Sequence, residues 1–255
     1  MRLHQRLLIV VSCLMTAPDT ARRARYLVIS NGHGEDSIAA ALVKRLVDTA
    51  DVEAYPFIGM GNAYAGLCPI VGPRGHVATG GSRSTKGSLW HDISQGGLAI
   101  FPPAIKFLRS VRNRYDRIIV LGDTLIPTLA LVSGLRDLFY IDVYKTGWTR
   151  GYSAAERFVL TRTCSKVLCR KDSLAEILRQ SGIDALNAGN LMMDTIPYGD
   201  FDAASRRSKS LALLLLPGSR KEVQRNFVFY VDLLSQLNRD TLPDIFLAVA
   251  GGVSI

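Results

Sequence analysis

Short apolar runs alternate with amphipathic segments along most of this chain, and this alternation constrains the fold more than any other feature. RYLVIS (25–30), DRIIVLGD (116–123) and KVLCR (166–170) are typical of buried strands, and segments with helical spacing of apolar residues separate them. Strands that alternate with helices form a parallel sheet with helices on both faces. The sequence therefore predicts an α/β fold, with a Rossmann-like parallel sheet over residues 25–195.

The pattern stops in a polar segment at 195–210 and then restarts. LALLLLP (211–217) and DIFLAVAGG (244–252) are typical of strands, and residues 223–237 between them have helical spacing. Two strands do not make a stable sheet by themselves. Residues 211–255 are therefore predicted to be the start of a second, incomplete Rossmann-like domain.

Residues 1–24 begin with charged residues and continue into a short apolar run, which resembles a signal segment. The run is too short to span a bilayer. These residues are predicted to be an N-terminal extension that lies outside the fold.

The charge and the metal-binding residue types limit the classes of partner. The net charge is +9, with 31 Lys and Arg against 22 Asp and Glu, which favours anionic partners. The basic residues do not form an aromatic-laced stripe, so nucleic acid is not a predicted partner. Four cysteines and four histidines are scattered along the chain, which indicates neither a metal site nor a disulfide framework.

The turn after the first strand is the first candidate site. It contains Gly32, His33, Gly34, Glu35 and Asp36. No acidic residue stands at the end of the second strand to hold a ribose, and two carboxylates would repel a pyrophosphate, so the turn is not predicted to bind a dinucleotide. Its glycines allow the backbone to approach another ligand closely. In the alternative interpretation, Asp36 or Ser37 only caps the following helix.

Two further sites are suggested by residues that follow strands. Asp123 ends a central strand, at the edge where open α/β sheets bind ligands, and its carboxylate is a candidate general base. The alternative is an N-cap for a helix that begins at Thr124. In LLPGSRKE (215–222), Pro217-Gly218-Ser219 is expected to form a tight turn that places Arg220 and Lys221 at a helix N-terminus, which suits a phosphate group. The alternative is a solvated basic turn.

LAIFPPAIKFLRSVRNR (98–114) interleaves apolar and basic residues on an amphipathic helical pattern that Pro102-Pro103 is expected to break. Such a segment is typical of a helix that lies on an anionic membrane surface. The alternative is a helix that packs on the sheet and exposes a charged outer face.

Four motifs together resemble those of the lipid-A-disaccharide synthase family of glycosyltransferases. The most specific is LLPGSR (215–220), and the others are VLGD (120–123), GNLMMD (189–194) and SNGHGEDSIAAAL (30–42). Asn190 and Leu191 stand where the family has His-Pro, and Glu35 does not match the glutamate of the family's first turn. The HGED form resembles a divergent cyanobacterial-type branch of related proteins.

The resemblance implies a GT-B architecture of two Rossmann-like domains and an inverting hexosyl transfer. A UDP-linked acylated glucosamine would be the donor, and a lipid-linked sugar, an acylated glucosamine 1-phosphate, the acceptor. The family acts in the cytoplasm, peripherally on the inner face of the plasma membrane, and needs no metal or cofactor. Carried over to this chain, Asp123 or Asp36 would be the base and Arg220 would steady the diphosphate. Residues Gly32, His33, Gly34, Glu35, Asn190 and Ser219 would bind substrate.

Two alternatives remain open at this point. One is another GT-B enzyme, such as a UDP-sugar epimerase or an undecaprenyl-linked transferase. The other is a non-catalytic acceptor-binding fragment, because family members continue well past the position of residue 255 and carry most of their nucleotide-sugar site there.

Overall fold

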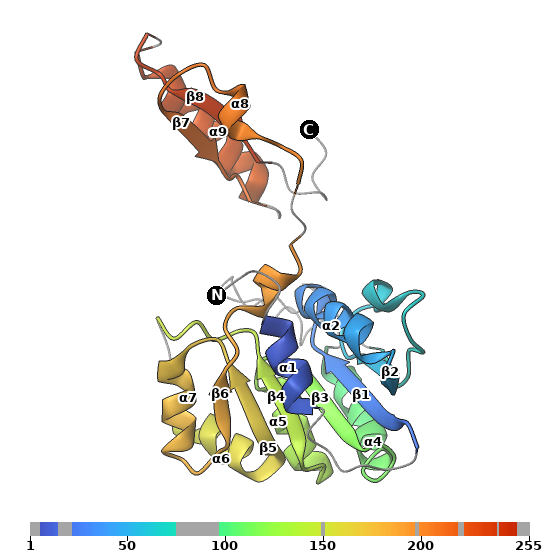
Figure 1. The fold of residues 1–255 in the computed structure, drawn as a ribbon. Helices are drawn as coiled ribbons and strands as arrows, with labels where there is room; N and C mark the ends of the chain where they lie inside the picture. Colours follow the sequence, from blue (N-terminus) through green and yellow to red (C-terminus); the bar gives the residue numbers. More distant parts are fainter. Residues whose placement is uncertain are drawn as a thin grey trace. The chain divides into compact units, whose positions relative to one another are not determined.

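A computed structural model of the 255-residue chain describes residues 6–14, 22–74, 97–148, 151–196, 199–218, 222–238 and 240–248. The chain divides into two compact units, Met1–Pro197 and Tyr198–Ile255 (Figure 1). The division falls inside the polar segment that the sequence shows at 195–210. Each unit is described by itself.

The first unit is built on a six-stranded sheet in which all neighbouring strands are parallel. The strands lie in the order β2-β1-β3-β4-β5-β6. This arrangement confirms the predicted α/β fold with a Rossmann-like parallel sheet. The strands are β1 (Ala24–Ser30), β2 (Ala50–Pro56), β3 (Arg117–Gly122), β4 (Leu138–Asp142), β5 (Cys164–Cys169) and β6 (Ala185–Asn187).

The direction of each connection determines which face of the sheet its helix covers. Crossovers between parallel strands are right-handed, so a connection that moves one way along the sheet places its helix on the opposite face from a connection that moves the other way. Only the connection from β1 to β2 runs toward the β2 end of the strand order, and it contains α2 (His33–Leu46). The other face carries α4 (Phe101–Ser110), α5 (Leu125–Ser133), α6 (Ala154–Thr163) and α7 (Asp172–Arg179).

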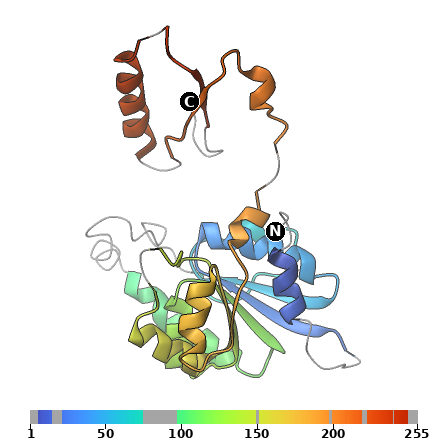
Figure 2. The ribbon, with the colours of Figure 1, turned by 60° about the vertical axis from the view of Figure 1, so that its left-hand side comes forward.

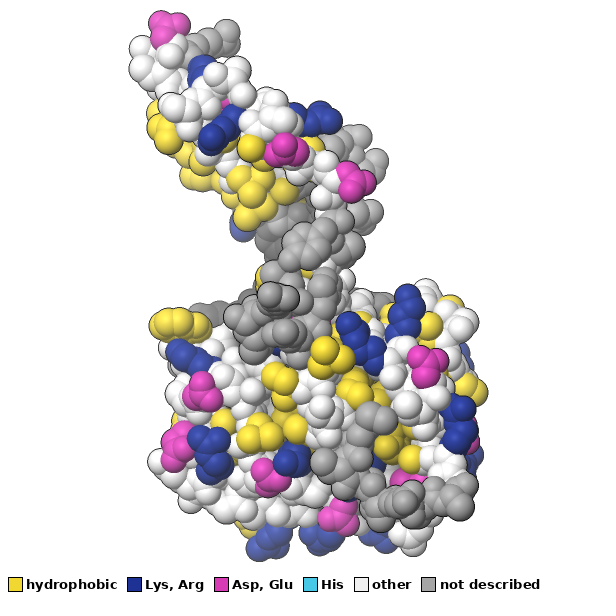
Figure 3. Space-filling model, viewed as in Figure 1, with side chains coloured by type: hydrophobic (Ala, Val, Ile, Leu, Met, Phe, Trp, Pro, Cys, Tyr) yellow, Lys and Arg dark blue, Asp and Glu magenta, His cyan; other side chains and the backbone are white. Residues whose placement is uncertain are grey.

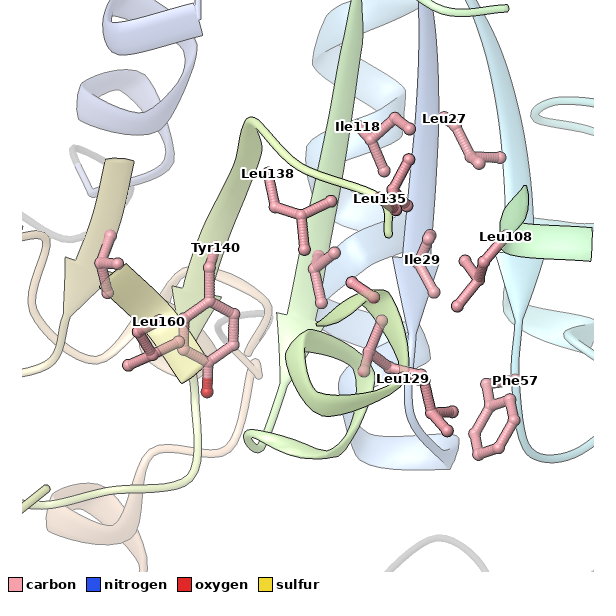
Figure 4. Close-up of a cluster of buried hydrophobic side chains, with 14 of the residues drawn as sticks. Leu27, Ile29, Phe57, Leu108, Ile118, Leu129, Leu135, Leu138, Tyr140 and Leu160 are labelled. Carbon is pink, nitrogen blue, oxygen red and sulfur yellow. The ribbon is translucent and has the colours of Figure 1, made fainter. Parts of the chain in front are cut away.

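Two apolar clusters fill the two faces of the sheet. Leu27 and Ile29 of β1 belong to the cluster beneath α4 to α7, part of which Figure 4 shows. Tyr26 and Val28 belong to the cluster beneath α2. Because successive side chains of a strand point to opposite faces, β1 is buried on both sides and reads as a continuous apolar run.

The N-terminal helix α1 (Arg6–Leu14) is part of the first unit, so the prediction that residues 1–24 lie outside the fold is wrong for this segment. Leu7, Val10 and Leu14 are fully buried in the same cluster as α2. The Asp194 carboxylate accepts a hydrogen bond from the Leu7 backbone N–H at 2.9 Å and forms an ion pair with Arg6 at 3.3 Å. Figure 1 shows α1 in front of the sheet, beside α2.

The strand order explains why the sheet needs this helix. Four strands lie on the β3 side of β1, and all of their crossover helices pack on the same face. The opposite face of that half would otherwise expose apolar side chains to water. Helix α1 covers them, and its cluster includes Ile119, Leu121, Phe139, Ile141 and Leu168 from β3, β4 and β5.

Helix α4 packs its apolar side against the sheet. Ala104 and Leu108 are buried, and Phe107 packs against the same cluster. This matches the alternative given for residues 98–114, a packed helix with a charged outer face, and the apolar side is not free to enter a bilayer. Pro102 and Pro103 do not break the helix as expected, because they stand in its first turn, where a missing N–H costs no hydrogen bond.

Smaller elements complete the first unit. The expected strand at 67–72 is reduced to a single bridge between Ala54 and Ile70. Within the described residues, no helix is both long and apolar enough to cross a membrane. Three short 3₁₀ helices are η1 (Asn62–Tyr64), η2 (Gly97–Ile100) and η3 (Leu191–Asp194).

The second unit contains one strand–helix–strand element. Strands β7 (Ala212–Leu215) and β8 (Asp244–Leu247) are parallel, α9 (Glu222–Ser235) connects them, and the short helix α8 (Ala203–Arg206) precedes them. Figure 2 shows α9 beside the two strands. Many large apolar side chains of this unit are exposed, as Figure 3 shows on the face in view. The most exposed are Leu211, Leu216, Phe229 and Phe201.

Candidate functional site

The strand order places a topological switch point at the carboxyl ends of β1 and β3. The chain leaves β1 toward β2 on one side, and later continues from β3 toward β4 on the other side. The helices after β1 and β3 therefore lie on opposite faces of the sheet. Open α/β sheets bind their ligands at this switch point. The turns that meet there begin at Asn31 and at Asp123.

Asn31 and Asp123 contact each other across the switch point. The Asn31 Nδ2 atom donates to Asp123 Oδ1 at 2.8 Å, and the same oxygen accepts from the Leu125 backbone N–H at 2.9 Å. Helix α5 begins at Leu125, and its N-cap is Thr124. The alternative in which Asp123 is the N-cap of a helix that begins at Thr124 is therefore wrong, although the Asp123 carboxylate accepts the first N–H of α5. Asp123 is half-buried.

The approach of the two turns depends on Gly122. Its φ of 146° lies in a region that other residues rarely adopt, and an added Cβ would stand 2.9 Å from the Asn31 Cβ. The Asn31 Oδ1 atom is buried and has no hydrogen-bond partner among the described residues. A buried acceptor without a donor is costly, and such atoms often mark the place of a ligand.

The HGED turn folds differently from the sequence prediction. Helix α2 begins at His33, and Gly32 precedes it with a φ of 155° and no side-chain cap. Asp36 is therefore the fourth helical residue, and its backbone N–H donates to the Gly32 carbonyl at 2.7 Å. The expectation that Asp36 or Ser37 is the N-cap is wrong. The glycine starts the helix earlier than capping preferences indicate.

Asp36 lies beneath the turn rather than on its surface. It is 2% exposed, and its carboxylate accepts a hydrogen bond from the Ser30 hydroxyl. The Ser30 hydroxyl also contacts the Tyr64 hydroxyl at 2.6 Å. Burial raises the pKa of Tyr64 well above its usual range, so the phenol stays protonated. This network holds α2 against β1, and it leaves a substrate little access to Asp36.

The other residues of the turn lie closer to solvent. Gly34 is exposed and Glu35 is half-buried. The Glu35 carboxylate folds back over Gly32, where an added Cβ would stand 3.1 Å from Glu35 Oε2. His33 is described as the first residue of α2, and its side chain is outside the described part of the structure.

A small pocket of about 50 Å³ extends the crevice from β3 to β4. The Lys145 Nζ atom forms an ion pair with Glu156 at 2.9 Å, and the Thr124 hydroxyl donates to the same carboxylate at 3.3 Å. Burial opposes ionisation of Glu156, but the Ser153 backbone N–H and Lys145 outweigh it and lower the pKa of this carboxyl. The pocket is lined by Asp123, Thr124, Tyr140, Asp142, Tyr144, Lys145 and Glu156.

Asp142 is the buried carboxyl group of this pocket. It is 1% exposed and receives hydrogen bonds from the Tyr152 hydroxyl and from the backbone N–H groups of Tyr144 and Lys145. Burial raises the pKa of Asp142, and the hydrogen bonds and the Lys145 charge act in the opposite direction. The raised pKa of a carboxyl group in a crevice is a feature of functional sites.

One described residue that the sequence predicted, Asn190, does not join this group. Asn190 follows β6, three strand positions from β3, which corresponds to about 14 Å at ordinary strand spacing. It precedes η3, which contacts α1. Ser219 and Arg220 lie outside the described residues. The structure therefore brings together the turn after β1 and Asp123, and it leaves Asn190 apart from them.

The sequence prediction missed Asn31, Asp142, Lys145 and Glu156. FYID (139–142) ends in a carboxylate after a buried strand, which is the same signal that identified Asp123 in VLGD (120–123). Applied to both strands, this signal would have found Asp142. The pairing of Lys145 with Glu156 joins residues that are eleven positions apart, and no local pattern indicates it.

Within the described residues, no cluster of three or more His, Cys, Asp or Glu side chains has an arrangement suited to a metal ion. The chain matches no protein-family model and no curated protein sequence.

Proposed function

We propose that this chain belongs to a glycosyltransferase of the lipid-A-disaccharide synthase type. In this proposal it transfers an acylated glucosamine from UDP to an acylated glucosamine 1-phosphate. The observation that carries the proposal is the half-buried Asp123 carboxylate at the switch point, held by Asn31 and by the start of α5. A base in that position is what an acceptor hydroxyl needs. The motif resemblance supplies the identity of the two sugars.

Asp123 is the better of the two candidate bases. Its hydrogen bonds from Asn31 Nδ2 and Leu125 N fix the orientation of the carboxylate, while the side chain stays partly accessible. Asp36 is 2% exposed and bonded to Ser30. An acceptor hydroxyl must come within hydrogen-bond distance of the base, so the proposal assigns proton removal to Asp123.

The proposed reaction is a single displacement. The acceptor oxygen attacks the anomeric carbon of the donor as Asp123 takes the hydroxyl proton. The bond from that carbon to the UDP oxygen breaks, the configuration inverts, and UDP leaves with the electron pair. The motif resemblance implies that Arg220 stabilises the negative charge that develops on the departing diphosphate and that Ser219 helps to bind the substrate.

The proposed acceptor carries acyl chains, so we also propose peripheral binding to the anionic inner face of the plasma membrane. The basic face of α4 supports this proposal. Lys106 and Arg109 are exposed there, and Arg112 is exposed just after the end of the helix. Since the apolar side of α4 packs in the core, the attraction would be electrostatic rather than insertive.

The test is the release of UDP from a UDP-acylglucosamine in the presence of the acylated glucosamine 1-phosphate. Asp123→Asn should reduce turnover by about 10²–10⁴-fold, the usual contribution of a general base. Asp51→Asn is the matched control, because Asp51 is an exposed aspartate near the start of β2, at the opposite edge of the sheet. Undiminished turnover in Asp123→Asn, or equal losses in both variants, would contradict the assignment.

A further inference from the structure

The loop Val143–Trp148, which follows β4, presents two exposed aromatic side chains at the carboxyl edge of the sheet. Tyr144 is 62% exposed and Trp148 is 82% exposed. Tyr144 also lines the pocket that contains Asp123 and Glu156. Tyrosine and tryptophan combine a large apolar ring with a polar group, and they are enriched where proteins bind ligands. Their exposure beside a polar pocket therefore suggests a binding surface.

Several contacts hold this loop in one conformation. The Asp142 Oδ1 atom accepts the backbone N–H groups of Tyr144 and Lys145, both at 2.9 Å. Arg170 Nη1 donates to the Val143 carbonyl at 2.9 Å. The Lys171 Nζ atom lies 3.8 Å from the centre of the Trp148 ring. These contacts fix the backbone of the loop and the Trp148 ring, and a loop that is ordered in advance loses less conformational entropy when a ligand binds.

The charges around the pocket indicate the class of ligand. Asp123, Asp142 and Glu156 contribute three carboxyl groups, and the cation that lines the pocket, Lys145, is already paired with Glu156 at 2.9 Å. Like charges repel, so a phosphate or a nucleotide is disfavoured at this position. Carboxylates accept hydrogen bonds from hydroxyl groups. A neutral ligand with several hydroxyl groups fits this arrangement.

The size of the pocket limits which part of a ligand can enter it. A volume of about 50 Å³ admits one hydroxyl or hydroxymethyl group but not a whole sugar ring. A pyranose has an apolar face of C–H groups and a rim of hydroxyl groups. It could place one rim group in the pocket while its apolar face rests on an aromatic ring outside.

We propose that the pocket and the loop Val143–Trp148 form a subsite for a neutral pyranose ring. Tyr144 contacts the apolar face of the sugar, Glu156 and Asp123 accept its hydroxyl groups, and Trp148 forms the outer edge of the subsite. The choice of a glucosamine as this sugar rests on the proposed function. The pyranose class itself follows from the charge, size and aromatic lining of the pocket.

The chain offers a built-in probe, because its two tryptophans are Trp90 and Trp148. In the full chain carrying Trp90→Phe, the emission of Trp148 is recorded while methyl N-acetylglucosaminide is added. A saturable change in emission is expected. Tyr144→Ala in the same background should weaken the apparent affinity about tenfold, the effect of losing one good aromatic contact. Phe158→Ala is the control, since Phe158 is an exposed aromatic that stacks on Arg162 and does not line the pocket.

The outcomes separate this proposal from the proposed function. Sugar binding that Tyr144→Ala weakens and Phe158→Ala preserves supports the subsite, even in the absence of any UDP release. UDP release that stays unchanged in Tyr144→Ala, with no emission response to the sugar, overturns the subsite and leaves the transferase proposal intact. A response only to UDP, or only to phosphatidylglycerol vesicles, also overturns it, because the loop would then bind a nucleotide or a membrane.

Discussion

At the residue scale, Asp142 and Asp116 have surroundings that shift their pKa values in opposite directions. Burial raises the pKa of Asp142, so the folded chain holds this proton more tightly than the unfolded chain. Its contribution to stability is then fully present below the unfolded value near 3.8 and is lost as the pH rises through the raised folded value. Asp142→Asn should therefore flatten the fall in unfolding free energy above about pH 4, as measured by urea titrations at several pH values.

Asp116 provides the control of opposite sign. The Arg25 backbone N–H is the main cause of the lowered pKa of Asp116; burial acts against it, and the Arg22 side chain lowers the pKa further. Its contribution to stability is present above the unfolded value and is lost as the pH falls through the lowered folded value. Asp116→Asn should therefore cost more stability at pH 7 than at pH 3. If both variants changed the pH profile in the same direction, the assigned environment of Asp142 would be wrong.

The segments that follow β1 and β3 show how far residues of the site can be predicted from the sequence. A carboxylate directly after a buried strand is a local signal, and it pointed to Asp123, which the structure places beside Asn31 at the switch point. The burial of Asp36 was not predictable in this way. It depends on the φ of Gly32, which starts the helix early, and on Tyr64, which arrives from a segment 28 positions further along the chain.

At the scale of elements, α1 should contribute strongly to stability. Leu7 is fully buried against the sheet, whereas its neighbour Leu8 is 53% exposed. Leu7→Ala should lower the free energy of unfolding by about 2–5 kcal/mol, the usual cost of a leucine truncated in a packed core. Leu8→Ala should change it by less than about 0.5 kcal/mol, as surface substitutions do. Urea denaturation measures both, and equal effects would show that α1 does not pack as described.

The strands and helices were largely predictable, and the role of α1 was not. An apolar run bounded by turn residues identifies a strand locally, as in RYLVIS (25–30) and β1. Residues 6–14 also carry a clear local pattern, but the same pattern suits a signal segment. The sheet decides between a signal segment and a packed helix, because its crossover helices leave half of one face uncovered. That half is uncovered only because of the strand order.

The charged face of α4 leads to a second prediction at this scale. Replacing Lys106, Arg109 and Arg112 by Glu should abolish sedimentation with anionic vesicles, since each basic residue near such a surface contributes about 1 kcal/mol. Binding by the unchanged chain should weaken steeply with added salt, because the apolar side of α4 is already in the core. Neutral vesicles are the control. Sedimentation that resists both salt and the triple substitution would contradict the electrostatic proposal.

At the scale of the whole molecule, the two units differ in how much of their apolar surface they bury. The first unit has two apolar clusters, one on each face of a six-stranded sheet. Among its described residues, the second unit has two strands and leaves large side chains in water, including Leu211 at 73% and Phe229 at 60% exposure. Two-stranded sheets are marginal in isolation. The cooperative stability of the chain should therefore come from the first unit.

Separate fragments test this expectation. Residues 1–197 alone should unfold in a single cooperative urea transition with nearly the midpoint of the full chain, because their clusters are complete without the second unit. Residues 198–255 alone should show no cooperative transition and should bind the hydrophobic dye ANS, because β7, β8 and α9 leave apolar side chains uncovered. A sharp transition in the second fragment would mean that α9 buries enough of β7 and β8 to stabilise them. A loss of cooperativity in residues 1–197 would mean that the first unit depends on contacts from the second.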